Sequence, residues 1–327
     1  MLTRRIFGQR GLSAAVMGGL ASNAALAQAW PTSVITIVVP FPAGGSVDQL
    51  SRVVQSGLQQ RLGANVIVEN KPGAQGSLGT GLVARAKPDG GTWAMVFDTH
   101  AVNPSLQTMT FDTEKDLDPV LLIGTSPHLL CTHPSRAWKS FDDVLAAAKK
   151  DPGKLTYGSI GTGSLGHLTM VLLTKKAGIE MTHVPYRGGG PLLNDALAGH
   201  VDFSIASSAL VSTQVAAGSL KPLLQTGASR LTTVKDVPTA IEAGFTGFES
   251  YAWWGALAPK GTPEDLKTRM REAMIATYKE PVNFAQLTDT MQIATTFGGA
   301  ADMAAWVTKQ IKVWGDVARD NNIKAGQ

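Results

Sequence analysis

The chain has 327 residues, of which 44% are hydrophobic and 17% are charged. This composition is typical of a globular protein and excludes a disordered, collagen-like or disulfide-scaffold chain, and no apolar run reaches the ~18–20 residues that a membrane span needs. Three of the 29 basic residues lie in the acid-free stretch 1–27, so the remainder carries 26 basic against 25 acidic residues. A near-neutral remainder gives poor support to a nucleic-acid partner.

The first 27 residues have the pattern of a secretory signal peptide. A basic start precedes a weakly apolar stretch, and the tripeptide ALA at 25–27 has the small-x-small form of a cleavage site. The run TRRIF at 3–7 resembles a twin-arginine signal, although an ordinary signal with two adjacent arginines stays open. We therefore expect residues 1–27 to be removed and a mature protein, beginning near Gln28, to reside in the periplasm.

From residue 34 the chain alternates between strand-like and helix-like patterns. The β-branched run VITIVV is typical of a strand that is buried on both faces. The elements expected in this first half are a strand at 34–39, a helix at 48–62, a strand at 65–69, a helix at 77–86 and a strand at 92–97. This order predicts a parallel sheet with right-handed crossovers.

The pattern then restarts. The expected elements are strands at 120–124 and 128–132 around Pro127, a helix at 141–150 capped by Ser140, a strand at 155–158, a helix at 164–177, a strand at 179–184, a helix at 191–198, strands at 203–206, 220–225 and 251–258, and helices at 263–278 and 301–320.

Two extended segments, 120–132 and 250–258, bracket the middle block. The simplest arrangement is an α/β protein of two lobes, joined by two strand crossings with a cleft between them. We expect lobe 1 to comprise residues 28–125 and 251–327, and lobe 2 to comprise residues 126–250.

Three glycine-rich loops, at 40–48, 71–77 and 158–164, each follow a strand and precede a helix. In a parallel sheet such loops lie at the carboxyl ends of the strands, where ligands bind. Glycine lets the backbone approach a ligand closely, and the following helix N-terminus favours an anion. A tight turn that needs positive φ would be a sufficient explanation for one such loop. Three glycine-rich loops of the same composition, each before a helix, favour an anion site. The hydroxyl donors there are Ser46, Ser159, Thr162 and Ser164.

Other chemistries receive little support. The third loop matches a dinucleotide fingerprint, but the acidic Glu180 lies at the start of a strand instead of at its end, and an exported protein would meet little NAD. The sequence holds no HExxH, no paired cysteines and no Gly-x-Ser-x-Gly elbow. The single Cys131 cannot form an internal disulfide and is expected to be a buried, inert thiol. We expect no catalytic residue, metal or cofactor; an exported α/β hydrolase-type enzyme is the alternative.

Seven segments, in this order, resemble the Bug-type extracytoplasmic solute-binding receptors of tripartite tricarboxylate transporters. They are VPFPAGGSVD at 39–48, ENKPGAQGSLG at 69–79, HAVNPSL at 100–106, YGSIGTGSLGHL at 157–168, HVPYRGGGP at 183–191, GHVD at 199–202 and DVPTAIEAG at 236–244. The resemblance covers nearly all of the mature chain. It implies a monomeric Venus-flytrap receptor that captures a small carboxylate-bearing molecule, without chemistry, for membrane permease subunits or for sensing.

The resemblance also implies a set of ligand-binding residues. Those expected to hold a ligand carboxylate, through N–H groups, hydroxyls and water, are Phe41, Gly44, Gly45, Ser159, Thr162 and Ser164. Asp48 matches a position of ligand selection or loop anchoring. Asp202 and Ser207 are expected to face the cleft from the second lobe.

Three further residues complete the expected site. His100 belongs to the third motif. His167 follows the third loop, where it either donates to the ligand or is a packed, capping histidine. Asp98 stands where relatives often carry Gly, Ser or Thr. It either binds a ligand ammonium or hydroxyl, repels a second carboxylate, or is a solvent-facing or capping residue. The ligand class stays open among aliphatic dicarboxylates, acidic amino acids and aromatic carboxylates.

Overall fold

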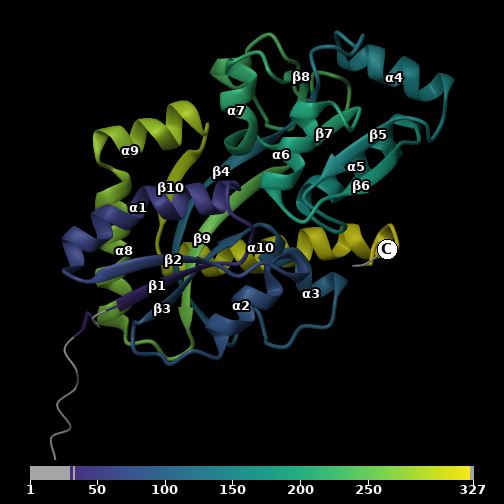
Figure 1. Ribbon diagram of the computed structural model, residues 1–327. Helices are drawn as coiled ribbons and strands as arrows, with labels where there is room; N and C mark the ends of the chain where they lie inside the picture. Colours follow the sequence, from purple (N-terminus) through teal and green to yellow (C-terminus); the bar gives the residue numbers. More distant parts are fainter. Residues whose placement is uncertain (1–29, 32–33, 325–327) are drawn as a thin grey trace, which may run out of the picture.

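The computed structural model describes residues 30–31 and 34–324, so the expected signal peptide lies outside the described residues. The strands are β1 (Val34–Val39), β2 (Asn65–Asn70), β3 (Thr92–Phe97), β4 (Leu117–Thr132), β5 (Thr156–Ser159), β6 (Thr182–Pro185), β7 (Phe203–Ser207), β8 (Lys221–Gln225), β9 (Tyr251–Pro259) and β10 (Ala294–Gly298). The α-helices are α1 (Ser46–Leu62), α2 (Ser77–Ala84), α3 (Thr99–Leu106), α4 (Phe141–Lys150), α5 (Leu165–Ala177), α6 (Gly189–Ala198), α7 (Ser208–Ala216), α8 (Glu264–Tyr278), α9 (Pro281–Ala285) and α10 (Ala300–Asp320). These elements form two α/β lobes (Figure 1).

The first lobe is built on the sheet β2-β1-β3-β9-β4. The buried run of β1 pairs in parallel with β2 and β3, which confirms the parallel βαβαβ unit, while β9 enters antiparallel between β3 and β4. Leu50, Val54 and Leu58 place the apolar stripe of α1 on one face, next to α8. The other face packs against α2, α3 and α10, so the sheet is buried between two helical layers.

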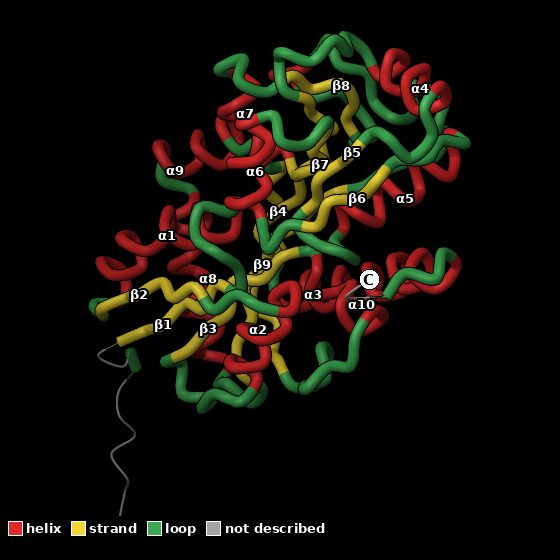
Figure 2. The backbone as a smooth tube through the Cα atoms, turned by 45° about the vertical axis from the view of Figure 1, so that its right-hand side comes forward, coloured by secondary structure: helices red, strands yellow, loops and turns green. Residues whose placement is uncertain are grey.

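The second lobe is built on the strands β4-β7-β5-β6, with β8 also paired to β4. Strand β4 belongs to both sheets, because it pairs with β9 as far as Pro127 and with β7 and β8 from His128 onward. Two strands were expected here, but β4 is one strand of 16 residues. Proline has no N–H and so cannot donate a hydrogen bond to a neighbouring strand. Pro127 lies where β4 changes its partner strands from β9 to β7 and β8, so the missing hydrogen bond does not break the strand. Figure 2 shows β4 and β9 between the two lobes.

A second connection returns through the chain that enters β9, where the Ser250 N–H donates to the Thr226 carbonyl at 3.1 Å. The C-terminal helix adds a contact that was not expected. Helix α10 packs on α3 of the first lobe and on α5 of the second, and Trp314 lies in an apolar cluster with Leu106 and Leu168. Helix α10 therefore also connects the two lobes, through contacts that are separate from the strand crossings.

Most of the expected elements are present with ends shifted by a few residues. Ser140 caps α4 as expected, in a reciprocal capping box with Asp143. Cys131 is buried as expected, and burial raises the pKa of its thiol to about 12. The short helices α3, α7 and α9 and the strand β10 were not anticipated. Within the described residues, no helix combines the length and apolar character needed to cross a bilayer.

Candidate ligand-binding site

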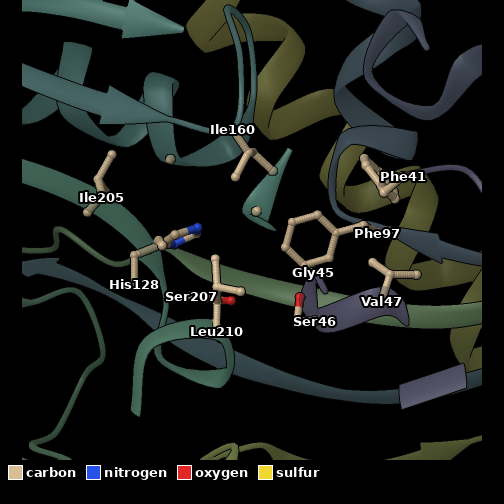
Figure 3. A pocket seen from close by; sticks show the side chains of 13 residues that line it. Phe41, Gly45, Ser46, Val47, Phe97, His128, Ile160, Ile205, Ser207 and Leu210 are labelled. Atoms are coloured by element: carbon tan, nitrogen blue, oxygen red, sulfur yellow. The ribbon is translucent and has the colours of Figure 1, made fainter. Parts of the chain in front are cut away.

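A cavity of about 30 Å³ lies between the lobes, and we call it the inner chamber (Figure 3). It is lined by Phe41, Gly45, Ser46, Val47, Phe97, His128, Ile160, Gly166, Gly189, Ile205, Ala206, Ser207 and Leu210. These residues come from both lobes. The space is enough for about two water molecules, so the two walls lie close together.

Helix N-termini converge on this chamber. The residues at the starts of α1 (Gly45 and Ser46), α6 (Gly189) and α7 (the N-cap Ser207) all line it. In none of these three helices does the N-cap side chain accept a hydrogen bond from the first turn, although the Ala209 N–H of α7 donates to the Ser126 hydroxyl at 3.3 Å. The first N–H groups of a helix have no partner within the helix, and their dipoles favour negative charge. The inner chamber therefore has the electrostatics of an anion site.

A fourth helix start also reaches the chamber, through Gly166 in the first turn of α5. Its N-cap residue Ser164 accepts a hydrogen bond from the His167 N–H, so this terminus is partly satisfied within the protein. Because a Cβ on Gly166 would lie 3.1 Å from the Ile205 carbonyl oxygen, a larger residue would press α5 away from β7.

The polar side chains of the inner chamber are Ser46, Ser207 and His128. The Ser46 hydroxyl accepts from the Trp254 indole at 3.2 Å, which leaves its own proton to donate into the chamber. The His128 ring lies among the chamber side chains in Figure 3, with Nδ1 at 3.3 Å from the Ser250 hydroxyl. Burial lowers the pKa of His128 to about 4, so the ring is neutral at pH 7.

The walls of the chamber are otherwise apolar. Phe41 packs edge-on against Phe97 with ring centroids 5.9 Å apart, and Ile160 faces them from the other lobe. Among the described residues that line the inner chamber, none is Asp, Glu, Lys or Arg. Attraction for a ligand charge must therefore come from backbone dipoles, and the apolar walls suit a hydrocarbon body.

A larger cavity, of about 500 Å³, lies beside the first, and we call it the outer chamber. It is lined by Pro40, Phe41, Pro42, Pro72, Gly73, Ala74, Gln75, Gly76, Thr99, Ile160, Gly161, Tyr186, Arg187 and Gly188. Phe41 and Ile160 line both chambers. The two cavities are thus neighbouring compartments, separated by one aromatic and one branched side chain from opposite lobes.

The lobes touch through glycine backbone. A Cβ on Gly189 would lie 3.5 Å from the Gly45 Cα, and one on Gly190 would lie 2.8 Å from the Ala43 carbonyl oxygen. The first glycine-rich loop therefore rests directly on the start of α6. This contact describes a closed cleft, since no side chain of ordinary size fits between the two backbones.

The first loop is anchored by Asp48. Its carboxylate accepts hydrogen bonds from the Gly44 N–H, from Arg52 and from Asn70, each at 3.0 Å. Burial alone would raise the pKa of Asp48, but the hydrogen bonds from Arg52, Gly44 and Asn70 hold it below its ordinary value. Loop anchoring, one of the two roles expected of Asp48, is the role that its geometry favours. Gly44 was expected to hold the ligand, but its N–H is already used here.

The third loop directs its hydroxyls inward. Ser159 and Ser164 are fully buried, and their hydroxyls bond to each other at 3.3 Å. The Ser159 hydroxyl also contacts Nε2 of His183 at 2.7 Å. Neither serine lines a chamber, and the half-buried Thr162 does not line one either. These three hydroxyl residues were expected to hold the ligand, but the structure places none of them in the lining of either chamber.

His167 takes the packed, capping role. Its Nδ1 accepts from the Gly163 N–H at 2.9 Å, and its ring stacks on His183 with centroids 4.1 Å apart. Burial lowers the pKa of His167 to about 4; burial and the neighbouring His167 lower that of His183 to about 3. Both rings are neutral at pH 7, and both form hydrogen bonds with residues of the third loop, His167 with Gly163 and His183 with Ser159.

Two expected site residues are buried within the first lobe. Asp98 is 1% exposed, lines neither chamber, and burial raises its pKa well above the ordinary value. His100 lines a separate cavity of about 120 Å³ between α3, β4, β9 and α10, and burial lowers its pKa to about 4. Asp98 is the N-cap residue of α3 and His100 lies in its first turn, and both side chains are buried instead of lining either chamber.

Asp202 is also absent from the cleft. It precedes β7, whereas the chamber lies beyond the carboxyl end of that strand at Ser207. Its carboxylate accepts from the Thr156 N–H and hydroxyl, at 2.9 and 3.0 Å, and pairs with Arg136 at 3.2 Å. The carboxylate therefore ties β5 to β7 at the far end of the second sheet.

The structure brings together four of the expected residues, Phe41, Gly45, Ser46 and Ser207, at the inner chamber. Their ligand-binding role stays a prediction. Sequence reasoning missed His128, Phe97, Ile205 and Leu210, together with the start of α6 at Gly189. The one available signal was position, because a strand or helix that ends beside a lobe crossing has its terminal residues at the cleft.

The chain matches the family model described as "Tripartite tricarboxylate transporter family receptor" over residues 50–323. It is 31% identical over 326 residues to a protein from Pseudomonas sp. strain P51, named for its place in the tcbD-tcbE intergenic region, covering 98% of this chain and 96% of that one. It is 30% identical over 308 residues to protein BugT of Bordetella pertussis, covering 91% and 92% of the two chains.

Solved structures agree with this match. The periplasmic binding protein BugD has a TM-score of 0.85 and 28% identity, over 90% of this chain and 99% of BugD. An R. palustris protein with adipate has a TM-score of 0.85 and 31% identity, over the same shares. MatC from Rhodopseudomonas palustris, with bound malate, has a TM-score of 0.81 and 29% identity, over 88% and 99%. The chain therefore belongs to the receptor family of the tripartite tricarboxylate transporters, a family of solute-binding proteins and not of enzymes.

Proposed function

We propose that this protein is a periplasmic receptor that captures a small carboxylate-bearing organic molecule between its two lobes. The observation that carries the proposal is the convergence of the α1, α6 and α7 N-termini on one apolar chamber without a charged side chain. Helix N-termini of this kind bind anions through their free N–H groups. A buried carboxylate keeps its charge there because the N–H groups replace its lost hydration.

The solved relatives support the ligand class. Two of them, both from R. palustris, were solved with adipate and with malate, which are aliphatic dicarboxylates. The Phe41, Phe97 and Ile160 walls of this chain suit the hydrocarbon part of such an acid. We propose that Gly45, Ser46 and Ser207 meet the carboxylate, and that the neutral His128 ring contributes a further hydrogen bond.

Capture requires the lobes to move. We propose that lobe 1 comprises residues 28–125 and 251–327, and that lobe 2 comprises residues 126–250. The inner chamber of the closed cleft holds about 30 Å³, so a ligand enters by separating the lobes and then favours the closed state by its contacts with both. Small-angle scattering should give a smaller radius of gyration with saturating ligand; an unchanged radius would contradict ligand-driven closure.

The family match supports delivery of the ligand to the permease subunits of a tripartite tricarboxylate-type transporter, or a sensing role. The signal-peptide pattern of the sequence at 1–27 supports export and a periplasmic location. Mass spectrometry of the periplasmic fraction should find a mature N-terminus near Gln28. A chain that begins at Met1 in that fraction would contradict cleavage.

A thermal-shift screen against a library of carboxylic acids tests the proposed function. A true ligand at ~100 times its Kd should stabilise the folded state by ~2.7 kcal/mol. The same ligand should be recovered unchanged after prolonged incubation, because a receptor retains its ligand and an exported hydrolase consumes it. A library in which no acid stabilises the protein, or a stabilising acid that is consumed, would refute the proposal.

A further inference from the structure

A chain of three hydrogen bonds runs beside the inner chamber and ends on the His128 ring. The Thr169 hydroxyl of α5 lies 2.7 Å from the Leu165 carbonyl oxygen and 2.6 Å from the Ser250 hydroxyl. The Ser250 hydroxyl in turn lies 3.3 Å from Nδ1 of His128. All four residues are buried, so bulk water does not compete for these hydrogen bonds.

The carbonyl at the start of this chain fixes the direction of every hydrogen bond in it. A carbonyl oxygen only accepts, so the Thr169 hydroxyl donates its single proton to Leu165. Thr169 then accepts from the Ser250 hydroxyl, whose only proton is thereby used. Ser250 therefore accepts from the histidine ring, which assigns a proton to Nδ1 of His128.

The other ring nitrogen of His128, Nε2, is left as a hydrogen-bond acceptor. Burial lowers the pKa of His128 to about 4, although a hydrogen bond with the Ser250 backbone opposes this shift. A neutral imidazole carries one proton, and because Nδ1 holds it, Nε2 has a free lone pair. The ring lines the inner chamber and extends toward its middle in Figure 3. Within the described part of the chain Nε2 has no hydrogen-bond partner, and it is not one of the fully buried atoms that lack one, so it is accessible from the chamber.

A ligand carboxylate has no proton to donate to this acceptor at neutral pH, so the donor is another group of the ligand. An ammonium group is disfavoured, because no Asp or Glu is present among the described residues that line the inner chamber. The starts of α1, α6 and α7 there also present the positive ends of helix dipoles, and a buried cation without a partner is costly. A hydroxyl group donates a proton without bringing a positive charge.

We propose that His128 determines specificity by accepting a hydrogen bond from a hydroxyl group of the ligand, so that the protein prefers hydroxy acids to the corresponding unsubstituted acids. The proposal rests on the proposed function, because the carboxylate at the helix N-termini brings the hydroxyl to the ring. An acid without a hydroxyl leaves Nε2 unpaired in the closed cleft, which weakens binding. Thr169 and Ser250 are positioning residues, since they decide which nitrogen of the ring carries the proton.

Nitrogen-15 NMR of histidine-labelled protein tests the tautomer, because protonated and bare ring nitrogens have well-separated chemical shifts. At pH 7.5 His128 should have a protonated Nδ1 and a bare Nε2, assigned by the signals that disappear in His128→Phe. Thr169→Val removes the acceptor of the Ser250 proton, which then turns to Nδ1 and shifts the ring proton to Nε2. Thr174→Val, the same change on α5 outside this chain, should leave the tautomer unchanged. A wild-type ring protonated at Nε2, or a tautomer that Thr169→Val does not alter, would overturn the assignment.

Calorimetry with matched ligands tests the preference itself. The probes are aliphatic mono- and dicarboxylic acids of three to six carbons, each beside its hydroxy, fluoro and amino forms substituted at carbon 2 or 3. Fluorine is close to a hydroxyl group in size but has no proton to donate. The wild type should bind its best hydroxy acid about tenfold more tightly than the unsubstituted and fluoro forms. His128→Phe should bring this ratio to about one, while His100→Phe, the same change at a buried histidine that lines neither chamber, should preserve it.

The outcomes separate this inference from the proposed function. Equal wild-type affinities for hydroxy and unsubstituted acids, or a ratio that His128→Phe preserves, would overturn the role of His128 while acid binding stands. Tighter binding of the amino forms than of the hydroxy forms would overturn the choice of a hydroxyl donor. A wild type that binds none of these acids would refute the proposed function and the inference together.

Discussion

The first and third glycine-rich loops face one another across the cleft with similar sequences, GGS and GTGS, but they use their polar groups in opposite ways. In the first loop the Asp48 carboxylate accepts a hydrogen bond from the Gly44 N–H, while Gly45 and Ser46 line the inner chamber. In the third loop Ser159 and Ser164 bond to each other and to the histidines beneath. The first loop therefore presents polar groups to the inner chamber, whereas the hydroxyls of the third loop stabilise the loop itself. A count of hydroxyl groups does not distinguish these two roles.

Blocking the first loop should have the largest effect. Gly45→Leu places a bulky side chain where the Gly45 and Gly189 backbones meet, so the lobes cannot close. We expect carboxylate affinity to fall by more than about 100-fold by calorimetry. Gly299→Leu is the matched control, because Gly299 is also a helix N-cap with φ of −72°, against −75° for Gly45, and lies outside both chambers. Comparable losses in the two variants would show that helix capping, and not closure, is responsible.

A pair of serine variants sharpens the comparison. Ser46→Ala removes a hydroxyl of the inner chamber and should weaken carboxylate binding by about tenfold, since a hydrogen bond to a charged group is worth ~1.5–3 kcal/mol. Ser164→Ala removes the N-cap of α5 and should lower the free energy of unfolding by about 1 kcal/mol while affinity changes less than about threefold. Urea denaturation and calorimetry on both proteins separate the effects. The reverse assignment, with affinity lost in Ser164→Ala, would give the third loop the contact role.

The histidine pair under the third loop should make stability depend on pH. His167 and His183 have folded pKa values of about 4 and about 3, below the 6.5 of an unfolded histidine. The unfolded chain therefore binds more protons below pH 6.5, and stability that is complete above pH 6.5 is lost as the pH falls toward 4. Each buried histidine contributes at most ~1.4 kcal/mol per pH unit, and the half-buried His183 contributes less.

Urea denaturation between pH 7.5 and 4.5 measures this dependence. His167→Gln should reduce the slope of unfolding free energy against pH by the share of one histidine, because the buried His100 and His128, with pKa values of about 4, contribute to the same slope. His200→Gln, whose side chain is 66% exposed, should leave it unchanged. A slope that is equally steep in His167→Gln would mean that the neutral histidines of the third loop do not set the pH response.

The sequence was sufficient to predict the regular part of the fold. The β-branched run of β1 and the apolar stripe of α1 indicate a strand and a helix by periodicity alone. Helices α3 and α7 escaped notice because they are short and begin directly after strands, where the apolar pattern hardly changes. The continuity of β4 escaped because Pro127 reads as a break, although its missing N–H falls where the strand changes partners.

The site was predictable only in part, for a physical reason. Glycine-rich loops before helices indicate where backbone N–H groups are presented, which was sufficient for Gly45 and Ser46. The sequence does not say which way a hydroxyl points, so Ser159 and Ser164 were placed at the ligand although they are buried. His128 and Leu210 come from distant segments that only the folding of β4 against β7 brings together.

The most direct test of the central claim compares a carboxylic acid with its primary amide. The two have nearly the same shape, but only the acid carries the charge that the α1, α6 and α7 N-termini are proposed to bind. Using the best acid from the thermal-shift screen, calorimetry at pH 7.5 should give an amide affinity at least about 100-fold weaker than that of the acid. Equal affinities for acid and amide would contradict an anion site built from helix N-termini.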